Sequence, residues 1–161
     1  MPVVEASVEV PVPPAIAFAV SQTTGAIRLR WDRFIRYQRF LDGAAAPAKG
    51  VRTLTVQRSG LRMVSEYASV RPPTSVGFKM LRGPWFFERM GGGWRFEPTA
   101  AGTRAVWRYN FRCRPRWLAP LAERIGARIL QHEIDRRIAG FADGCADPVV
   151  LAAVEADPAL M

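Results

Sequence analysis

Few side chains in this sequence are of types that commonly carry chemistry. Histidine occurs once, as His132, and tyrosine three times, as Tyr37, Tyr67 and Tyr109. A histidine can act as a general base near neutral pH, and a buried phenol can orient a carbonyl or hydroxyl group of a ligand. We therefore take Tyr109, Tyr67 and His132 as candidate catalytic groups. The structural alternative is that each phenol bonds a neighbouring backbone group and that His132 lies on a helix surface.

Other kinds of chemistry find no support. The two cysteines, Cys113 and Cys145, have no spacing typical of a zinc site, and with a single histidine only carboxylates remain as ligands. The run Gly91-Gly92-Gly93 lacks the spacing of a phosphate-binding loop and enters a predicted strand. We expect no metal, no cofactor, and two reduced cysteines.

The charge balance favours no single partner. The 161 residues contain 23 basic and 14 acidic side chains, a net charge of +9, and every basic residue except Lys49 and Lys79 is an arginine. These arginines are scattered along the chain, so the basic arm that commonly binds phosphates is missing and nucleic acid is not favoured. An anionic partner stays open, and so does a simple bias in codon usage.

Length and composition indicate one globular domain. Hydrophobic residues make up 49% and charged residues 23% of the chain, as in ordinary folded proteins. No apolar stretch approaches the ~20 residues of a membrane span, and Glu5 stands where a signal peptide would be basic. We expect a cytoplasmic protein without a membrane span.

The elements that must position the candidate groups follow from periodicity. Residues 4–10 alternate apolar and polar side chains and predict a strand, after which residues 15–21 and 25–31 predict two short helices. Six further strands follow at 34–41, 50–58, 61–71, 74–81, 85–96 and 103–113. Hairpin-length gaps predict an antiparallel meander, and the glycine triplet predicts a bulge or a close backbone approach.

The last of these strands has two distinct faces, and a long helix follows it. Residues 103–113 place aromatic side chains on one face and Arg104, Arg108 and Arg112 on the other. Residues 117–141 then predict a helix with two apolar stripes, Leu118/Leu121/Ala122/Ile125/Ile129 and Ala127/Leu130/Ile134/Ile138/Phe141. Such a helix should be covered on two sides, by the sheet and by the short helices. Glu133, Asp135, Arg136 and Arg137 are interpreted as solvated ion pairs on this helix.

This order of elements is similar to the helix-grip fold of the START-like superfamily, which includes polyketide cyclases/dehydrases, pollen allergens and lipid-transfer domains (SRPBCC). The local matches are Val8-Glu9-Val10-Pro11-Val12-Pro13-Pro14-Ala15, Trp94-Arg95-Phe96-Glu97-Pro98, Gly102-Thr103-Arg104 with Trp107, and Leu118-Ala119-Pro120-Leu121. The resemblance covers roughly residues 3–145. It implies an α+β fold in which a seven-stranded curved antiparallel sheet wraps a long C-terminal helix, with two short helices after the first strand. We assign residues 1–145 to this domain and 146–161 to a C-terminal tail that adds one or two helical turns at most.

The resemblance also implies a hydrophobic cavity between sheet and helix, which in the family holds lipids, polyketides or other aromatic molecules. The expected lining residues are Trp107, Tyr109, Phe111, Met63, Tyr67, Phe78, Met80, Trp85, Phe87, Leu121 and Ile125, with Arg39 included if its side chain points inward. The alternative is a solid core with no cavity.

Three functions remain open. The first is binding of a small hydrophobic or aromatic molecule by a monomer or homodimer. The second is a cyclase, aromatase or dehydratase reaction in the same cavity; the family has no universal catalytic residues to carry over, and we lean against an enzyme. The third is binding of an anionic surface or nucleic acid through the arginine-rich outer face of the sheet.

Overall fold

The structure of the protein is a computed structural model, and it describes residues 1–160. The elements are β1 (Val3–Val10), α1 (Pro14–Ser21), α2 (Gly25–Trp31), β2 (Ile35–Phe40), β3 (Arg52–Gln57), β4 (Arg62–Arg71), β5 (Ser75–Arg82), β6 (Phe87–Thr99), β7 (Gly102–Cys113), α3 (Ala119–Gly144) and α4 (Pro148–Glu155). The predicted succession of one strand, two short helices, six strands and one long helix is confirmed.

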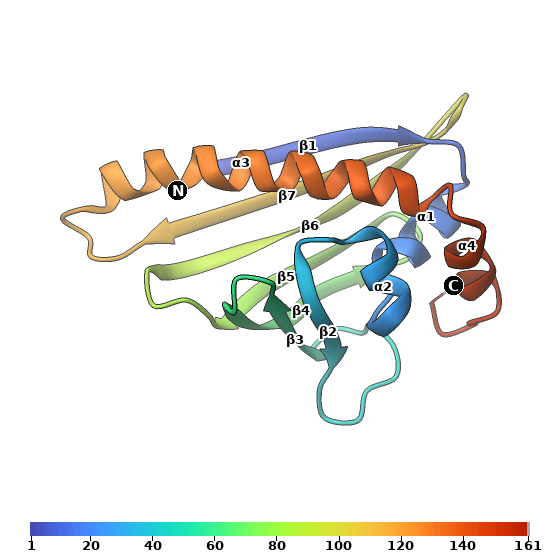
Figure 1. The fold of residues 1–161 in the computed structure, drawn as a ribbon, viewed down its shortest axis with the longest axis horizontal. Coiled ribbons are helices and arrows are strands. Elements are labelled where there is room, and N and C mark those ends of the chain that lie inside the picture. Colours follow the sequence, from blue (N-terminus) through green and yellow to red (C-terminus); the bar gives the residue numbers. More distant parts are fainter. Residues whose placement is uncertain (161) are drawn as a thin grey trace.

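The strands form one antiparallel sheet in the order β1-β7-β6-β5-β4-β3-β2. Strands β2 to β7 form a meander, and β1 pairs with the last strand, where Val3 faces Asn110 and Val10 faces Thr103. The sheet curls around α3, which crosses its concave side, while α1, α2 and α4 gather at one end (Figure 1). The curved sheet around a terminal helix is therefore the predicted architecture.

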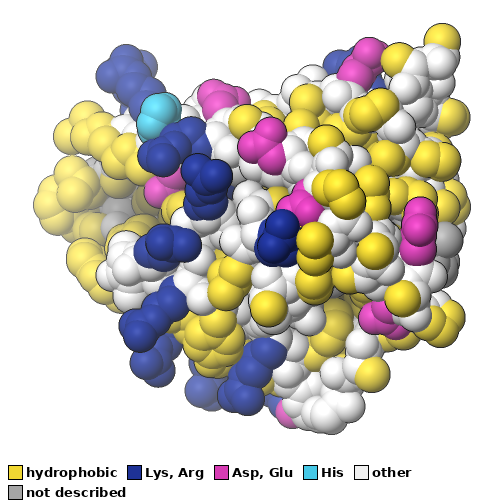
Figure 2. All heavy atoms as spheres, turned by 45° about the vertical axis from the view of Figure 1, so that its right-hand side comes forward, with side chains coloured by type: hydrophobic (Ala, Val, Ile, Leu, Met, Phe, Trp, Pro, Cys, Tyr) yellow, Lys and Arg dark blue, Asp and Glu magenta, His cyan; other side chains and the backbone are white. Residues whose placement is uncertain are grey.

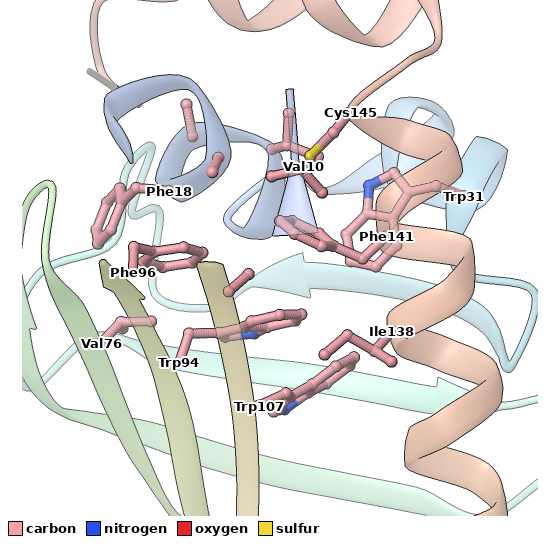
Figure 3. Close-up of a cluster of buried hydrophobic side chains, with 14 of the residues drawn as sticks. Val10, Phe18, Trp31, Val76, Trp94, Phe96, Trp107, Ile138, Phe141 and Cys145 are labelled. Carbon is pink, nitrogen blue, oxygen red and sulfur yellow. The ribbon is translucent and has the colours of Figure 1, made fainter. Parts of the chain in front are cut away.

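Alternation along β7 decides which side chains enter the core. Thr103, Ala105, Trp107, Tyr109, Phe111 and Cys113 are all buried, whereas Arg104 and Arg108 are exposed. The aromatic core continues from Trp107 through Trp94, which stacks on it with ring centroids 4.2 Å apart, to Phe141 of α3 (Figure 3). This cluster fills the space between the sheet and α3 at the end next to α1 and α2.

The glycine triplet lets neighbouring strands approach closely. A β carbon on Gly92 would lie 2.1 Å from the carbonyl oxygen of Arg108, and one on Gly93 would lie 2.1 Å from that of Val76. Any larger residue would push β6 away from the strands on either side. The predicted close backbone approach is present at both positions.

Helix α3 continues three residues past its predicted end at Phe141. Glycines near this end are needed for packing, because a β carbon on Gly140 would lie 2.3 Å from the carbonyl oxygen of Trp31. The side chain of Trp31 similarly occupies the space beside Gly144. Small residues on α3 thus allow α2 to pack directly against it.

The segment after residue 145 forms an eight-residue helix with a buried face. Asp147 caps this helix by accepting a hydrogen bond from the backbone N–H of Val149. Val150 and Val154 of α4 are fully buried and belong to the same core cluster as α1. The C-terminal segment, predicted only as a tail with a turn or two of helix, therefore contributes to the hydrophobic core.

Candidate ligand-binding cavity

A cavity of about 100 Å³ lies between the concave side of the sheet and α3. The helices α1, α2 and α3 and the strands β2 to β7 all contribute to its wall, because the sheet curls around α3 at this point. The lining residues are Ser21, Gln22, Arg28, Phe34, Gln38, Thr53, Thr55, Gln57, Met63, Ser65, Tyr67, Val76, Phe78, Pro84, Phe87, Met90, Trp94, Trp107, Tyr109, Leu130, Glu133 and Arg137. An engineered apolar cavity of about 150 Å³ holds benzene, so the volume seen here suits a fragment of one small ring or a few water molecules.

Six of the predicted lining residues lie on this wall: Trp107, Tyr109, Met63, Tyr67, Phe78 and Phe87. They come from β4, β5, β6 and β7, whose alternation fixed the inward face. Phe87 and Met90 both reach the cavity although their parity differs, because a register shift between Phe87 and Arg89 changes the face that β6 presents. The bulge thus extends the apolar part of the wall.

Other predicted residues lie away from the cavity. Phe111 is fully buried but packs on Phe87 in the core, and Met80 is half-buried and absent from the wall. Arg39 is exposed on edge strand β2. Its side chain therefore points outward and does not line the cavity. Trp85 is 79% exposed in the loop between β5 and β6, where no strand alternation applies.

The prediction for Leu121 and Ile125 is wrong, because their side chains are 56% and 50% exposed. Of the two apolar stripes of α3, the one that contains Leu130, Ile134 and Ile138 faces the sheet. The expectation that both stripes are covered is wrong as well, since Ile129 also remains exposed. The helix alone gives two equivalent apolar sides, and only the position of the sheet distinguishes them.

The three candidate catalytic groups are placed differently. Tyr109 and Tyr67 line the cavity, and the Tyr67 hydroxyl donates a hydrogen bond of 2.9 Å to Oε1 of Gln22. Burial raises the pKa of Tyr67 to about 12. His132 is exposed on α3 and does not reach the cavity wall. It lies on the helix surface, as the alternative interpretation expected.

A buried ionic network that the sequence reasoning missed forms one side of the cavity. Asp32, at the end of α2, is 0% exposed and accepts hydrogen bonds from two guanidinium groups. Arg28 donates to its Oδ2 from Nε and Nη2 at 3.0 and 2.9 Å. Arg137 donates from Nε to Oδ1 at 3.2 Å and from Nη2 to Oδ2 at 2.7 Å. The interpretation of Arg137 as a solvated residue is therefore wrong.

The same arginine connects the network to the cavity. Nη1 of Arg137 donates to the Tyr109 hydroxyl at 2.9 Å. Its guanidinium carbon lies 4.3 Å from the ring centroid of Trp107 and 4.6 Å from that of Phe34, so the cation lies between two aromatic faces. Arg137 is thus held in place from several directions at once.

The network sets the protonation of its members. Burial acts to raise the pKa of Asp32, but the charges of Arg137 and Arg28 outweigh it and lower that pKa to about 2. Burial raises the pKa of Tyr109, although Arg137 partly opposes the shift. Burial also raises the pKa of Glu133, a half-buried cavity residue one turn before Arg137. Asp32 therefore stays ionised across the physiological range.

Two buried polar atoms of the wall have no hydrogen-bond partner among residues 1–160: Nε1 of Trp107 and Oε1 of Gln38. Trp107 is 2% exposed and lies at the edge of the aromatic cluster, beside Ile138 (Figure 3). An unpaired buried donor costs about 1–3 kcal/mol, so a group that accepts from this indole would be bound favourably.

The wall is therefore more polar than expected. Polar atoms come from β3 and β4 through Thr53, Thr55 and Ser65, and from the α1–α2 region through Ser21 and Gln22. Apolar side chains dominate on β5, β6 and the middle of α3, through Phe78, Phe87, Met90 and Leu130. The cavity thus has a polar and an apolar portion, which suits a molecule of mixed polarity.

A sequence signal for the missed network did exist. Arg137 occurs three residues after Ile134 and four before Phe141, within the apolar stripe that faces the sheet. A charged residue at such a position must find a buried partner. The spacing of four between Arg28 and Asp32 is equally visible, but nothing in the sequence indicates that the three residues meet.

Within residues 1–160, no group of three His, Cys, Asp or Glu side chains is placed to hold a metal ion. Over the same residues, no helix has both the length and the apolar character needed to cross a membrane.

The outer face of the sheet carries the predicted arginines beside both acidic and basic neighbours. Arg104 lies opposite Glu9 and Glu97 in the strand register, and Arg108 lies opposite Glu5, whereas Arg112 lies opposite Arg89. The facing acids partly offset the charges of Arg104 and Arg108, but Arg112 and Arg89 add to the positive charge of this face. The third functional hypothesis therefore stays a prediction.

Comparison with solved structures agrees with this architecture. The chain is similar to the crystal structure of TTHA0849 from Thermus thermophilus, with 19% identity, a TM-score of 0.73, and coverage of 94% of this chain and 99% of that one. It is also similar to Ara h 8.0201 (15% identity, TM-score 0.68, coverage 91% and 99%). A START superfamily protein from Mycobacterium smegmatis matches with 12% identity, a TM-score of 0.67 and coverage of 88% and 97%. These likenesses show that the chain has the helix-grip fold.

The family assignment follows from the sequence match. The family described as "Polyketide cyclase / dehydrase and lipid transport" matches residues 1–145, and the chain belongs to it. No curated protein sequence matches significantly.

Proposed function

We propose that the cavity binds a small organic molecule with an apolar body and a hydrogen-bond acceptor, such as a carbonyl, phenol or carboxylate, at one end. The observation that carries the proposal is the unpaired indole N–H of Trp107 on a wall that also presents Tyr109 and Arg137. These three side chains carry hydrogen-bond donors on one wall, and the apolar side chains of β5 and β6 are available to contact the rest of the molecule. The family's description, which names lipid transport and polyketide reactions, is consistent with such a ligand.

The volume limits what enters without movement. A space of about 100 Å³ accommodates part of one small ring or a short chain segment, whereas sites for drug-sized ligands span about 300–1,000 Å³. A larger ligand requires displacement of wall residues. The half-buried side chains of Met90 and Leu130 are the ones to move, because they lie on the wall without the polar contacts that fix Arg137.

A ligand screen with matched variants tests the proposal. We expect thermal stabilisation by members of a panel of fatty acids, sterols, polyphenols and aromatic carbonyl compounds, with native mass spectrometry to confirm one bound molecule. Trp107→Phe keeps the ring but removes the N–H, and should weaken the best ligand about 2- to 15-fold, the value of one hydrogen bond. Trp117→Phe makes the same change at an exposed site and should have no effect. Equal weakening by both variants, or a panel without a single ligand, would contradict the proposal.

A second candidate is a cyclase, aromatase or dehydratase reaction in the same cavity. It is favoured by Glu133, whose raised pKa suits a general base, on the same wall as the phenol of Tyr109. Turnover of a poly-β-ketone substrate that falls at least about 100-fold in Glu133→Gln and Tyr109→Phe would support it. His132→Ala serves as the control, because that side chain lies outside the cavity. Turnover unchanged in both cavity variants would exclude these residues.

A further inference from the structure

An apolar surface lies at the end of the molecule opposite α1, α2 and α4. It consists of Leu81, Trp85, Trp117, Leu118, Leu121, Ile125 and Ile129, which we call the apolar end. Trp85 and Trp117 are 79% and 81% exposed, so these two indoles extend almost fully from the protein. Single exposed apolar residues are common, but seven at one end of a protein of this size are not.

The two loops that carry Trp85 and Trp117 are neighbours in space although they come from two parts of the chain. The backbone N–H of Arg114 donates to the carbonyl of Phe86 at 2.8 Å, and Arg116 pairs with Glu88 at 3.1 Å. These contacts bring the loop between β5 and β6, which carries Trp85, beside the loop that carries Trp117 and leads into α3. Both connections lie at the left in Figure 1.

The exposed stripe of α3 extends the same surface along the helix. Leu118, Leu121, Ile125 and Ile129 recur every three or four residues and therefore lie on one side. Arg124 and Arg128 each precede a member of the stripe by one residue, so they flank it at about 100° around the helix. Figure 2 shows hydrophobic side chains gathered beside the single histidine, with arginine and lysine side chains along their border.

The charge around the apolar end is strongly positive. Residues 81–89 and 114–132 contain six arginines, all exposed: Arg82, Arg89, Arg114, Arg116, Arg124 and Arg128. The same segments contain only two acids. Glu88 is already paired with Arg116, and Glu123 accepts the backbone N–H of Cys113. This surface therefore retains uncompensated positive charge.

We propose that the apolar end docks onto the surface of a lipid bilayer that contains anionic headgroups. Tryptophan is the residue that most favours the membrane–water interface, and an apolar helix stripe flanked by arginines is the pattern of an interfacial helix. Each arginine near such a surface adds about a fivefold gain in affinity. A second copy of this chain is the less favourable occupant, because a symmetric contact would bring two arginine-rich rims together.

The docking surface adjoins the cavity. Pro84 and Leu130 line the cavity and directly neighbour Trp85 and Ile129 in the chain, and the cavity residue Phe87 is two residues from Trp85. A docked protein would therefore hold the apolar part of its cavity next to the membrane, where an apolar ligand is concentrated. Only this transfer role rests on the proposed ligand binding, whereas docking itself depends on the surface alone.

Vesicle co-sedimentation tests the docking. The full chain should bind phosphatidylcholine vesicles containing 30% phosphatidylglycerol and should bind pure phosphatidylcholine vesicles at least about tenfold less well, with a blue shift of tryptophan fluorescence on binding. Trp85→Ser/Trp117→Ser should reduce binding at least about tenfold. Arg124→Gln/Arg128→Gln should reduce it roughly thirtyfold, while Arg104→Gln/Arg108→Gln on the outer sheet face should change it less than about threefold.

Other outcomes would overturn the proposal. Absence of binding to anionic vesicles at low salt, or unchanged binding by Trp85→Ser/Trp117→Ser, refutes it directly. A dimer that sedimentation velocity detects and that these two substitutions dissociate would assign the apolar end to self-association instead. The variant Trp107→Phe separates the two proposals: it should bind vesicles normally while losing affinity for the cavity ligand, and Trp85→Ser/Trp117→Ser should do the reverse.

Discussion

The substitution Asp32→Asn examines the buried network most directly. The side chain keeps its size, but the negative charge shared by Arg28 and Arg137 disappears, and the amide NH₂ faces groups that can only donate hydrogen bonds. Removal of one partner from a buried ion pair costs about 3–5 kcal/mol. Because two buried guanidinium groups depend on this carboxylate, we expect the free energy of unfolding to fall by about that amount.

The pH dependence gives a second, independent magnitude. The pKa of Asp32 is lowered from 3.8 to about 2, so the folded state favours the ionised carboxylate by roughly 2 kcal/mol. This contribution is complete above about pH 4, the ordinary pKa of the group, and is lost as the pH falls toward 2. Asp32→Asn cannot titrate and should lack this part of the acid destabilisation.

Urea unfolding followed by tryptophan fluorescence, at pH 7 and at steps down to pH 2.5, measures both quantities. Asp42→Asn is the matched control, because Asp42 also bonds an arginine in two places but is exposed at 56% of its side chain. Exposed ion pairs contribute about 0–1 kcal/mol. Asp42→Asn should therefore lose much less stability than Asp32→Asn.

A loss at Asp32 no greater than that at Asp42 would refute the reasoning, because it would mean that the two buried arginines do not depend on the carboxylate. An acid transition identical in the wild type and Asp32→Asn would refute the lowered pKa separately.

Three further predictions concern the rest of the fold. Val150→Ala removes two methyl groups from a fully buried site on α4 and should cost about 2 kcal/mol in urea unfolding, whereas Val149→Ala, at a half-exposed position on the same helix, should cost less than about 0.5 kcal/mol. Gly92→Ala should cost about 1–3 kcal/mol and lower the melting temperature, because its β carbon would meet the carbonyl of Arg108; an unchanged melting temperature would count against the close approach. His132→Ala should leave both stability and cavity-ligand affinity unchanged by isothermal titration, and a loss of affinity would place the imidazole in the site after all.

Much of the fold could be predicted because it depends on local patterns. Strict alternation in β7 fixed which side chains face inward, and the change of period after Cys113 marked the start of the long helix. Glycine and proline divided the strands at positions close to the observed ends. Such signals act within a few residues and need no knowledge of distant neighbours.

The cavity could be predicted only in part. Met63, Tyr67 and Phe78 were found from the alternation of β4 and β5, although the pairing of these two strands contains register shifts, whereas the bulge in β6 obscured the parity that brings Met90 to the wall. Trp94 was missed as well. Alternation identifies the inward face of a strand but does not tell which inward residues border a space and which fill it.

The two sides of α3 show the limit most clearly. Periodicity predicts two apolar stripes of similar strength, and the sequence contains no information about which one the sheet covers. The structure buries Ile134 and Ile138 and leaves Leu121 and Ile125 exposed. That choice creates both the cavity wall and the surface that we propose for membrane docking.

Periodicity and turn residues by themselves predicted an antiparallel meander followed by a long helix, because those signals arise from neighbouring residues, whereas the curvature of the sheet was implied only by the family resemblance. Only the tertiary structure decided that Asp32, Arg28 and Arg137 share one buried site, since α2 and α3 contribute residues more than a hundred positions apart in the chain. A charge's environment depends on everything packed around it, and its neighbours in sequence are a small part of that surrounding.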